Sequence, residues 1–102
     1  MLDPGFGFGK SFEENYPLVA GFEELHELNF PLLAGVSRKS FIGRTVFTGA
    51  VPAGKVPPQD RLYGTLAAQT ALILEGAHII RTHDVRPSVE AARIADAILR
   101  AR

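Results

Sequence analysis

Three short clusters of polar residues and glycines have the clearest chemical potential in this sequence. Residues 3–10 combine one carboxylate, Asp3, with three glycines, two phenylalanines and a lysine. Residues 37–40 contain two adjacent cations, and residues 81–84 contain an arginine, a histidine and a carboxylate. A carboxylate accepts paired donors from the edge of a heterocyclic ring, and cations stabilise phosphate-like anions. If the clusters meet, they suit a ligand with a flat hydrogen-bonding ring and an anionic tail.

The glycine cluster has the composition of a nucleotide-binding loop but not the spacing. A P-loop needs a glycine, then four intervening residues, then Gly-Lys-Ser or Gly-Lys-Thr. With Gly9-Lys10-Ser11 as its end, the first glycine would have to stand where the chain has Pro4. Counted from Gly5 or Gly7, the third glycine of a dinucleotide-binding fingerprint is also absent. A purely structural turn remains the alternative. The position of Asp3 at the end of a predicted buried strand favours a ligand contact, because an unpaired buried charge is costly.

The other two clusters follow predicted buried strands. Residues 37–40 are either a solvated loop or a cationic part of a ligand site. Arg81 and His83 share one face of a strand, since strand side chains alternate, and each needs an anionic partner. Asp84 is one candidate partner for a nearby cation, and a phosphate-bearing ligand is the other. His26 and His78 have no such setting, and we expect both to be structural or exposed.

Composition narrows the class of protein. The 102 residues suffice for one small domain, and eleven basic residues balance eleven acidic ones. This balance argues against general attraction to nucleic acid or to an anionic membrane. There is no cysteine, so thiolate metal sites and disulfides are excluded, and a cytoplasmic setting fits. Neither a signal peptide nor an apolar run of the ~20 residues that cross a bilayer is visible.

Three strands should alternate with three helices and hold these clusters in place. The predicted elements are a strand end at residues 1–2, a helix from Tyr16 or Pro17 to Leu28, a strand over 32–36, a helix capped by Asp60 and stopped by Gly76, a strand over 78–83 and a helix beginning at Pro87. Residues 45–59 predict a loop rich in glycine and proline. The last helix should bury a stripe formed by Ala91, Ile94, Ala95 and Ile98.

This alternation predicts an α/β fold with parallel strands and crossover helices. The three clusters then lie at the carboxyl ends of the strands, where parallel α/β proteins bind ligands. Only two residues precede the first cluster, whereas a strand needs roughly five. We therefore expect residues 1–102 to be the back part of a larger enzyme.

The three clusters, in this order and at these separations, resemble dihydropteroate synthase. The matching motifs are Asp-Pro-Gly-Phe-Gly-Phe-Gly-Lys, Ser-Arg-Lys-Ser-Phe-Ile-Gly and Arg-Thr-His-Asp-Val. The resemblance implies a (β/α)8 TIM barrel, of which this chain carries the sixth to eighth βα units. Residues 1–102 would form a partial pterin-binding domain without the N-terminal part of the barrel. It also implies a cytoplasmic homodimer when complete, and Mg2+ held by the missing part.

The family condenses 6-hydroxymethyl-7,8-dihydropterin diphosphate with 4-aminobenzoate, giving 7,8-dihydropteroate and diphosphate in folate biosynthesis. By resemblance, Asp3 hydrogen-bonds the amino-pyrimidine edge of the pterin and Phe8 lies near the pterin and aminobenzoate rings. Gly35 lets the pterin ring approach, and Lys39 contacts the pterin.

The remaining matches concern the anionic groups. Ser37 corresponds to a serine near the aminobenzoate carboxylate. Arg81 corresponds to an arginine that lies over the pterin face near the diphosphate, and His83 to the histidine that holds diphosphate. Arg81 and His83 would stabilise the leaving group, and the resemblance assigns no metal ligand within this chain.

Two alternatives remain open. Another pterin-binding barrel, such as a methyltetrahydrofolate methyltransferase domain, fits the fold, but a methyl donor does not need the cations of residues 37–40 and 81–83. A non-catalytic truncated product is the second alternative. With half of the pocket wall outside the chain, we expect residues 1–102 alone to be inactive.

Overall fold

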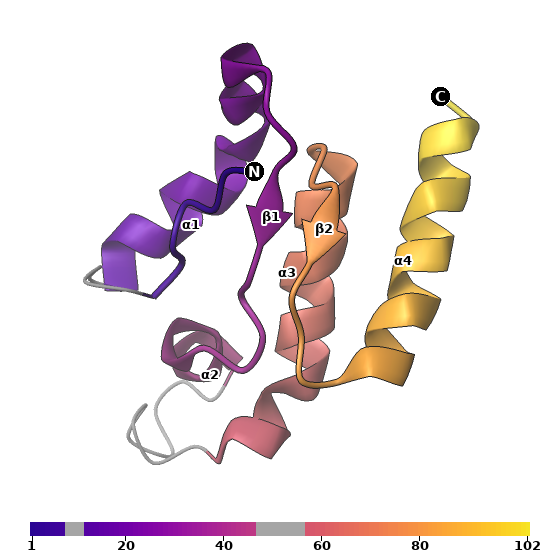
Figure 1. The fold of residues 1–102 in the computed structure, drawn as a ribbon. Coiled ribbons are helices and arrows are strands. Elements are labelled where there is room, and N and C mark those ends of the chain that lie inside the picture. Colours follow the sequence, from indigo (N-terminus) through magenta and orange to yellow (C-terminus); the bar gives the residue numbers. More distant parts are fainter. Residues whose placement is uncertain (8–11, 47–56) are drawn as a thin grey trace.

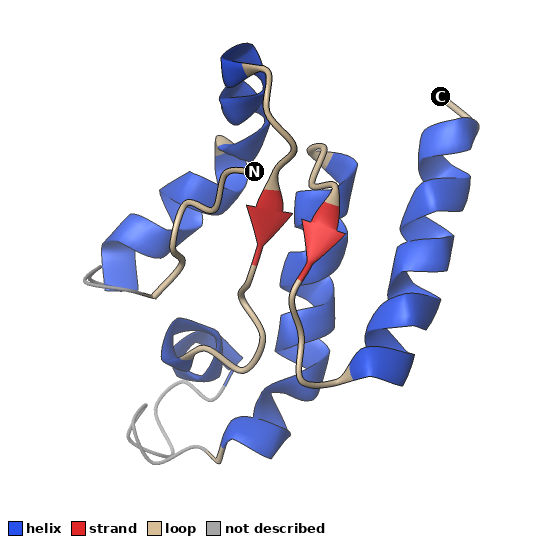
Figure 2. Cartoon of the chain, viewed as in Figure 1, coloured by secondary structure: helices blue, strands red, loops and turns tan. Residues whose placement is uncertain are grey.

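The structure is a computed structural model that describes residues 1–7, 12–46 and 57–102. The described residues form an α/β arrangement with short strands and longer helices (Figures 1 and 2). In chain order the elements are α1 (Phe12–Ala20), the 3-10 helix η1 (Phe22–Leu28), β1 (Leu33–Ala34), α2 (Ser40–Val46), the 3-10 helix η3 (Pro58–Arg61), α3 (Leu62–Leu74), β2 (Ile79–Ile80) and α4 (Val85–Arg100). None of the described helices has the length and apolar character needed to cross a membrane.

Three extended segments run parallel, as the sequence predicts. β1 pairs with β2 in the register Leu33 to Ile79 and Ala34 to Ile80. Leu2 adds a parallel bridge on the other side of β1, where its N–H donates to the Pro31 carbonyl at 2.8 Å. The regular strands are shorter than the predicted ranges 32–36 and 78–83. One more backbone hydrogen bond follows the paired residues, from the Arg81 N–H to the Ala34 carbonyl at 3.0 Å.

The helices cover the strands unequally. α3 lies behind β1 and β2, α4 lies beside β2, and α1 and η1 flank the N-terminal segment (Figure 1). α3 and α4 form the most extensive contact between two elements. The carboxyl ends of β1 and β2 point toward α2 and the start of α4, and this edge carries the polar clusters.

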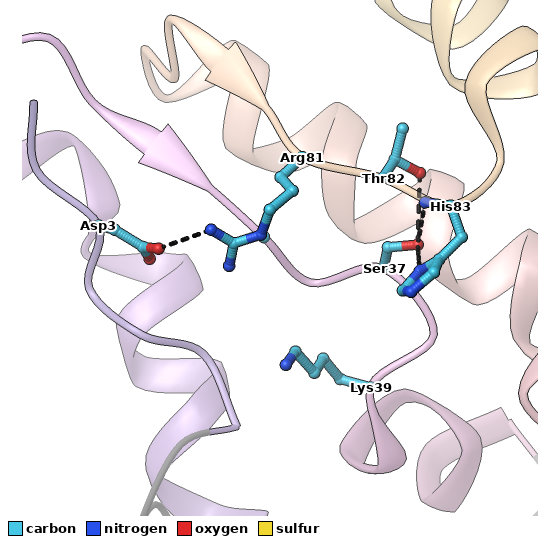
Figure 3. Close-up of a pocket in the computed structure, with 7 residues that line it drawn as sticks. Asp3, Ser37, Lys39, Arg81, Thr82 and His83 are labelled. Atoms are coloured by element: carbon cyan, nitrogen blue, oxygen red, sulfur yellow. Dashed lines mark hydrogen bonds and ion pairs between the residues drawn. The ribbon is translucent and has the colours of Figure 1, made fainter.

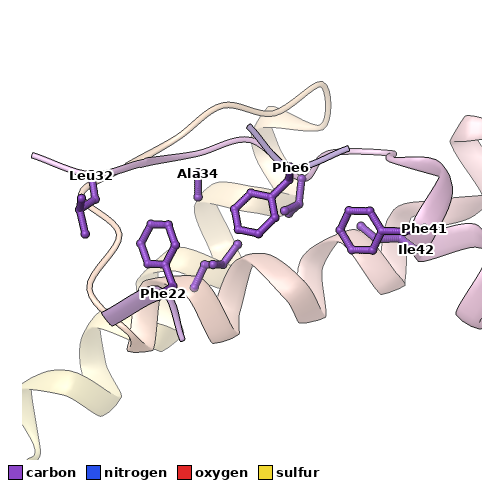
Figure 4. Packing of buried hydrophobic residues seen from close by; sticks show 8 residues of the cluster. Phe6, Phe22, Leu32, Ala34, Phe41 and Ile42 are labelled. Carbon is purple, nitrogen blue, oxygen red and sulfur yellow. The ribbon is translucent and has the colours of Figure 1, made fainter. Parts of the chain in front are cut away.

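The hydrophobic core lies between the strands and α3 (Figure 4). Its members are apolar side chains from the N-terminal segment, η1, residues 32–36, α2 and α3, namely Phe6, Phe22, Leu32, Ala34, Val36, Phe41, Ile42 and Leu72. The rings of Phe6 and Phe22 stack with centroids 6.3 Å apart. The glycine-rich N-terminal segment is therefore anchored by its first phenylalanine.

The first helical region differs from the prediction of one helix ending at Leu28. α1 begins at Phe12 and includes Pro17, and a separate 3-10 helix follows Gly21. Pro17 lacks an N–H and cannot bond to the preceding turn, but its carbonyl accepts the Gly21 N–H at 2.9 Å. The proline is thus tolerated close to the end of a short helix.

The second helical region was predicted only in part. α2 begins at Ser40, the last residue of the 37–40 cluster, where the sequence analysis had no helix. Of the predicted 45–59 loop, residues 47–56 lie outside the described residues, and the rest belongs to α2, η3 and the residue between. Asp60 does not cap α3, because it lies within η3 and α3 begins at Leu62. Gly76 adopts φ +104° just beyond α3, as predicted for a helix stop.

The last helix begins at Val85, two residues before the predicted start at Pro87. The predicted buried stripe is wrong in part, since Ala95 is buried but Ile94 and Ile98 are 64% and 42% exposed. α3 covers only the side of α4 that carries Ser88 and Ala95, which are both buried. The flanking apolar side chains have no cover within the described part of the chain.

Candidate functional site

A cavity of about 530 Å³ opens at the carboxyl ends of the strands (Figure 3). Its lining combines the three polar clusters, and consists of Asp3, Gly35, Ser37, Lys39, Arg81, Thr82 and His83. The structure thus brings together six residues that sequence analysis selected, and it adds Thr82. Phe8 lies outside the described residues. Phe6, the other phenylalanine of the glycine cluster, is buried in the core and does not line the cavity.

Asp3 and Arg81 form an ion pair across the cavity, from opposite ends of the sequence (Figure 3). Arg81 Nη1 lies 3.1 Å from Asp3 Oδ2, while the Gly5 N–H donates to Asp3 Oδ1 at 2.9 Å. The side chains are 54% and 33% exposed, so both can exchange this pairing for a ligand at modest cost. Sequence analysis assigned Asp3 to the ring of a ligand and Arg81 to its anionic part. In the structure these two side chains pair with each other.

Gly35 makes room for Arg81. A Cβ atom at position 35 would lie 2.4 Å from Arg81 Nη2 and 2.9 Å from its Cζ. The guanidinium group therefore rests directly on the bare backbone of residue 35. The resemblance assigned this glycine to the approach of a ring, and in the structure it admits the planar end of an arginine.

The glycine turn brings the N-terminal segment against Lys39. Gly5 and Gly7 have φ +75° and +82°, a backbone region that other residues rarely adopt. The Gly7 N–H donates to Asn15 Oδ1 at 2.8 Å, which joins the turn to α1. A Cβ atom at Gly7 would lie 3.1 Å from Lys39 Cδ, so the turn also borders the lysine stem.

Ser37 and His83 meet on the opposite wall of the cavity. Ser37 Oγ lies 2.8 Å from His83 Nδ1 and accepts the His83 backbone N–H at 3.0 Å. Thr82 Oγ1 lies 3.3 Å from Ser37 Oγ and 3.0 Å from Ser88 Oγ, and Ser88 Oγ donates to Gln69 Oε1 at 2.9 Å. A line of hydrogen-bonding groups thus runs from the cavity to the interface of α3 and α4.

Arg38 does not line the cavity, and instead holds the loop that carries Ser37 and Lys39. Its φ of +56° is unusual for a residue other than glycine and costs ~1–3 kcal/mol. Its N–H donates to Thr65 Oγ1 at 3.0 Å, and its carbonyl accepts Arg61 Nη1 at 2.7 Å. These bonds hold the strained residue from both sides.

The Arg38 side chain forms a two-pronged ion pair with Asp84. Nε and Nη2 lie 3.1 and 2.8 Å from the two carboxylate oxygens. This hydrogen bonding lowers the pKa of the Asp84 carboxyl below its ordinary value and raises the pKa of Arg38 above its own. The partner that the sequence left open for Asp84 is therefore Arg38.

His26 and His78 lie away from this site and have structural contacts, as predicted. Their rings form an edge-to-face pair with centroids 5.4 Å apart. His78 Nδ1 accepts the Leu32 backbone N–H at 2.9 Å, which ties the residue before β2 to the residue before β1. Within the described ranges, no three His, Cys, Asp or Glu side chains gather into a possible metal site.

Sequence reasoning missed the residues behind the cavity wall. Thr82, Ser88, Gln69, Arg61 and Thr65 hold Ser37, Arg38 and His83, and all but Thr82 are buried. One sequence signal was available, because Gln69 and Thr70 interrupt an otherwise apolar run over residues 66–74. A buried polar side chain in such a helix needs a hydrogen-bond partner.

The cavity can bind a ligand with opposite chemistry at its two ends. Asp3 offers carboxylate oxygens at one end, and Lys39, Arg81 and His83 offer cationic or N–H donors around the rest. Ser37 is 6% exposed and already bonded to His83, and this setting suits positioning. The arrangement suits binding and orientation of a ligand, because the one hydroxyl of the lining that faces a histidine nitrogen, that of Ser37, is buried.

Comparison with known proteins gives a consistent result. The profile of the pterin binding enzyme family matches residues 1–83. Dihydropteroate synthase of Escherichia coli K12 is 48% identical over 102 residues, which are the whole of this chain and 33% of that protein. The Synechocystis enzyme is 42% identical over 98% of this chain and 32% of its own length. The chain therefore spans about a third of the length of the curated relatives it matches.

Solved structures agree. The crystal structure of Yersinia pestis dihydropteroate synthase with a sulfonamide drug complex has a TM-score of 0.88 and 46% identity, covering 99% of this chain and 34% of that one. The Coxiella burnetii enzyme in complex with pteroic acid has a TM-score of 0.86 and 39% identity, covering 98% and 34%. The chain therefore belongs to the family of pterin-binding enzymes, and the relatives it matches along its whole length include dihydropteroate synthases.

Proposed function

We propose that this chain supplies part of the active site of a dihydropteroate synthase. The reaction joins 6-hydroxymethyl-7,8-dihydropterin diphosphate to 4-aminobenzoate and releases diphosphate. The observation that supports it best is the cavity in which Asp3, Lys39, Arg81 and His83 converge from three distant clusters. Relatives solved with a sulfonamide drug and with pteroic acid support the same substrate classes.

The pterin binds at the end of the cavity that contains Asp3. The Asp3 carboxylate accepts two hydrogen bonds from the amino-pyrimidine edge. These replace its contact with the Arg81 guanidinium, which lies at 3.1 Å in the structure. Arg81 then lies over the ring as a cation on a π system. Lys39 completes this side of the proposed site. The resemblance assigns a ring contact to Phe8 as well, but that residue lies outside the described residues.

The diphosphate leaves toward Arg81 and His83. The bond between the pterin methylene carbon and the diphosphate oxygen breaks, and the bond from that carbon to the amine nitrogen of 4-aminobenzoate forms. The nitrogen then loses a proton to water. The aniline nitrogen is a sufficient nucleophile for this substitution without activation by a base. The protein therefore contributes orientation of the substrates and stabilisation of the negative charge on the departing diphosphate. Ser37 would lie near the aminobenzoate carboxylate.

The finer parts of the proposal concern the whole enzyme. The chain would carry the sixth to eighth βα units of a (β/α)8 barrel, with residues 1–102 a partial pterin-binding domain. The complete enzyme would be a cytoplasmic homodimer, with neither nucleic acid nor membrane as a partner. Magnesium would assist the reaction, but the described side chains do not group into a site that fits it, so its ligand is expected in the rest of the barrel.

A titration with the pterin diphosphate, followed by an assay for 4-aminobenzoate incorporation, tests the proposal. Saturable binding that is lost in Asp3→Asn and in Arg81→Ala supports it. Lys39→Gln should weaken binding, whereas Arg86→Gln, an exposed cation on α4 outside the cavity lining, should not. Binding without turnover by residues 1–102 agrees with a partial site. Absence of binding even in a complete barrel would favour a non-catalytic product, and methyl transfer would favour a methyltetrahydrofolate methyltransferase.

A further inference from the structure

The hydrogen-bonding line behind the cavity fixes which nitrogen of His83 carries the proton. His83 Nδ1 faces Ser37 Oγ at 2.8 Å, so one of these two atoms must donate to the other. No other hydrogen bond reaches the His83 ring from the described part of the chain. The question is therefore decided by where the hydroxyl proton of Ser37 goes.

The available acceptors leave that proton one destination. Ser37 Oγ accepts the His83 backbone N–H, and at its contact with Thr82 the geometry makes Thr82 the donor. If His83 Nδ1 also donated to Ser37, the serine proton would lack an acceptor among the described residues although Ser37 is 6% exposed. An unsatisfied donor at such a position is costly, so Ser37 donates and His83 Nδ1 accepts.

The deeper groups support this direction. As oriented, Gln69 accepts from Ser88, and its buried Nε2 has no hydrogen-bond partner within the described residues. A half-turn of the amide lets Nε2 donate to Ser88, which frees the Ser88 proton for Thr82 and the Thr82 proton for Ser37. Every hydroxyl then donates toward the cavity and the line ends on His83 Nδ1. With Gln69 as oriented, Ser88 donates its proton to Oε1, and Thr82 has a single proton for its contacts with both Ser88 and Ser37. The turned amide is therefore the orientation in which every contact of the line has a donor.

We propose that Ser37, supported by Thr82, Ser88 and Gln69, holds His83 as the tautomer protonated at Nε2. A neutral imidazole protonated at Nε2 donates only from that atom, since its other nitrogen is occupied by Ser37. His83 thus donates to an anionic oxygen of a ligand even when uncharged. Ser88 and Gln69 are positioning residues that act through Ser37. The anion is the diphosphate if the proposed function holds, whereas the tautomer stands on the hydrogen bonds alone.

Nitrogen NMR of the protein labelled with 15N-histidine tests the tautomer. The spectrum is recorded near pH 8.5, about two units above the ordinary histidine pKa of ~6.5, so that neutral rings dominate. The chain has three histidines, and the His83→Gln variant assigns the resonances of His83 by their loss. His78 is an internal reference, because its Nδ1 accepts the Leu32 N–H.

The expected result is an unprotonated shift at His83 Nδ1 and a protonated shift at Nε2. Ser37→Ala should move both toward the average of two tautomers, Ser37→Thr should restore them, and Ser88→Ala should move them in the same direction by less. Thr70→Ala is the matched control, because its hydroxyl bonds within α3 to the Leu66 carbonyl and should leave His83 unchanged. A protonated Nδ1 in the unsubstituted protein overturns the proposal whether or not the variants fold.

Titration with inorganic diphosphate separates this inference from the proposed function. We expect the His83 Nε2 resonance to shift on saturation, and affinity to fall about tenfold in Ser37→Ala through the lost orientation. If the tautomer is as proposed but diphosphate leaves Nε2 unchanged, the assignment of His83 to that anion is wrong. If diphosphate binds but Nδ1 carries the proton, the hydroxyl line does not set the tautomer.

Discussion

Replacing Gly35 with alanine should damage the site far more than the fold. The backbone of Gly35 is not in the left-handed region, so alanine is allowed there, and such a substitution stabilises by ~0.4–1 kcal/mol through the unfolded chain. The new Cβ would lie 2.4 Å from Arg81 Nη2, whereas an ordinary contact is ~3.5 Å. The guanidinium must therefore move by about 1 Å or more.

The stability cost of that movement is small. The Arg81–Asp3 pair is half exposed on the arginine side, and such pairs contribute about 0–1 kcal/mol. The net change in the free energy of unfolding should thus stay within about 1 kcal/mol of zero. Thermal or urea unfolding, followed by circular dichroism, measures it.

The cost in ligand binding is larger. A hydrogen bond to a charged group is worth ~1.5–3 kcal/mol, so misplacing Arg81 should weaken pterin diphosphate binding about 10- to 150-fold. Calorimetric titration of Gly35→Ala, Arg81→Ala and the double variant tests the cause. The three atoms nearest to the added methyl group all belong to the Arg81 side chain, so once Arg81 is truncated Gly35→Ala should have little further effect. Unchanged affinity in Gly35→Ala, or fully additive losses in the double variant, would refute the reasoning.

Three other outcomes are expected. Gly76→Ala should lower the free energy of unfolding by ~1–3 kcal/mol, because φ is +104° and the new Cβ would lie 1.8 Å from His26 Nε2. Equal unfolding curves for this variant and the parent would contradict this prediction. Asp84 has a lowered pKa in the folded state, so its ion pair with Arg38 stabilises at pH values above the ordinary carboxyl pKa of ~3.8 and is lost as pH falls through the folded value. Asp84→Asn should therefore flatten the acid limb of the stability curve, and an unchanged limb would show that the pair contributes nothing. Residues 1–102 alone should give no incorporation of labelled 4-aminobenzoate, and measurable turnover by this chain would exclude the partial-site explanation.

Much of the architecture was predictable because strands and helices have distinct sequence periods. The alternation of apolar runs and amphipathic stretches predicted the parallel segments at Leu2, β1 and β2 and the helices between them. The left-handed stop at Gly76 was also predictable from residue type. The starts of helices were less so. Asp60 and Pro87 carry the usual signals, yet α3 is capped by Arg61, one residue after Asp60, and α4 begins at Val85, two residues before Pro87.

The buried or exposed state of apolar side chains was harder to predict. Ile94 and Ile98 have helical spacing with Ala95, but burial depends on which neighbour covers each side of α4. Phe6 and Phe8 are equivalent in a sequence motif, whereas packing against Phe22 decides that Phe6 belongs to the core. Periodicity identifies an apolar face and does not identify its partner.

The sequence by itself determined which residue types meet at the carboxyl edge of the strands, because parallel strands bring their ends to one side. It therefore selected Asp3, Lys39, Arg81 and His83 before any contact was known. Only the tertiary structure decided their pairing. Arg81 rests on Gly35 and reaches Asp3, Arg38 turns away to Asp84, and Ser37 bonds to His83. Hydrogen bonds and ion pairs act over about 3 Å, and which groups come that close depends on loop geometry that local sequence does not encode.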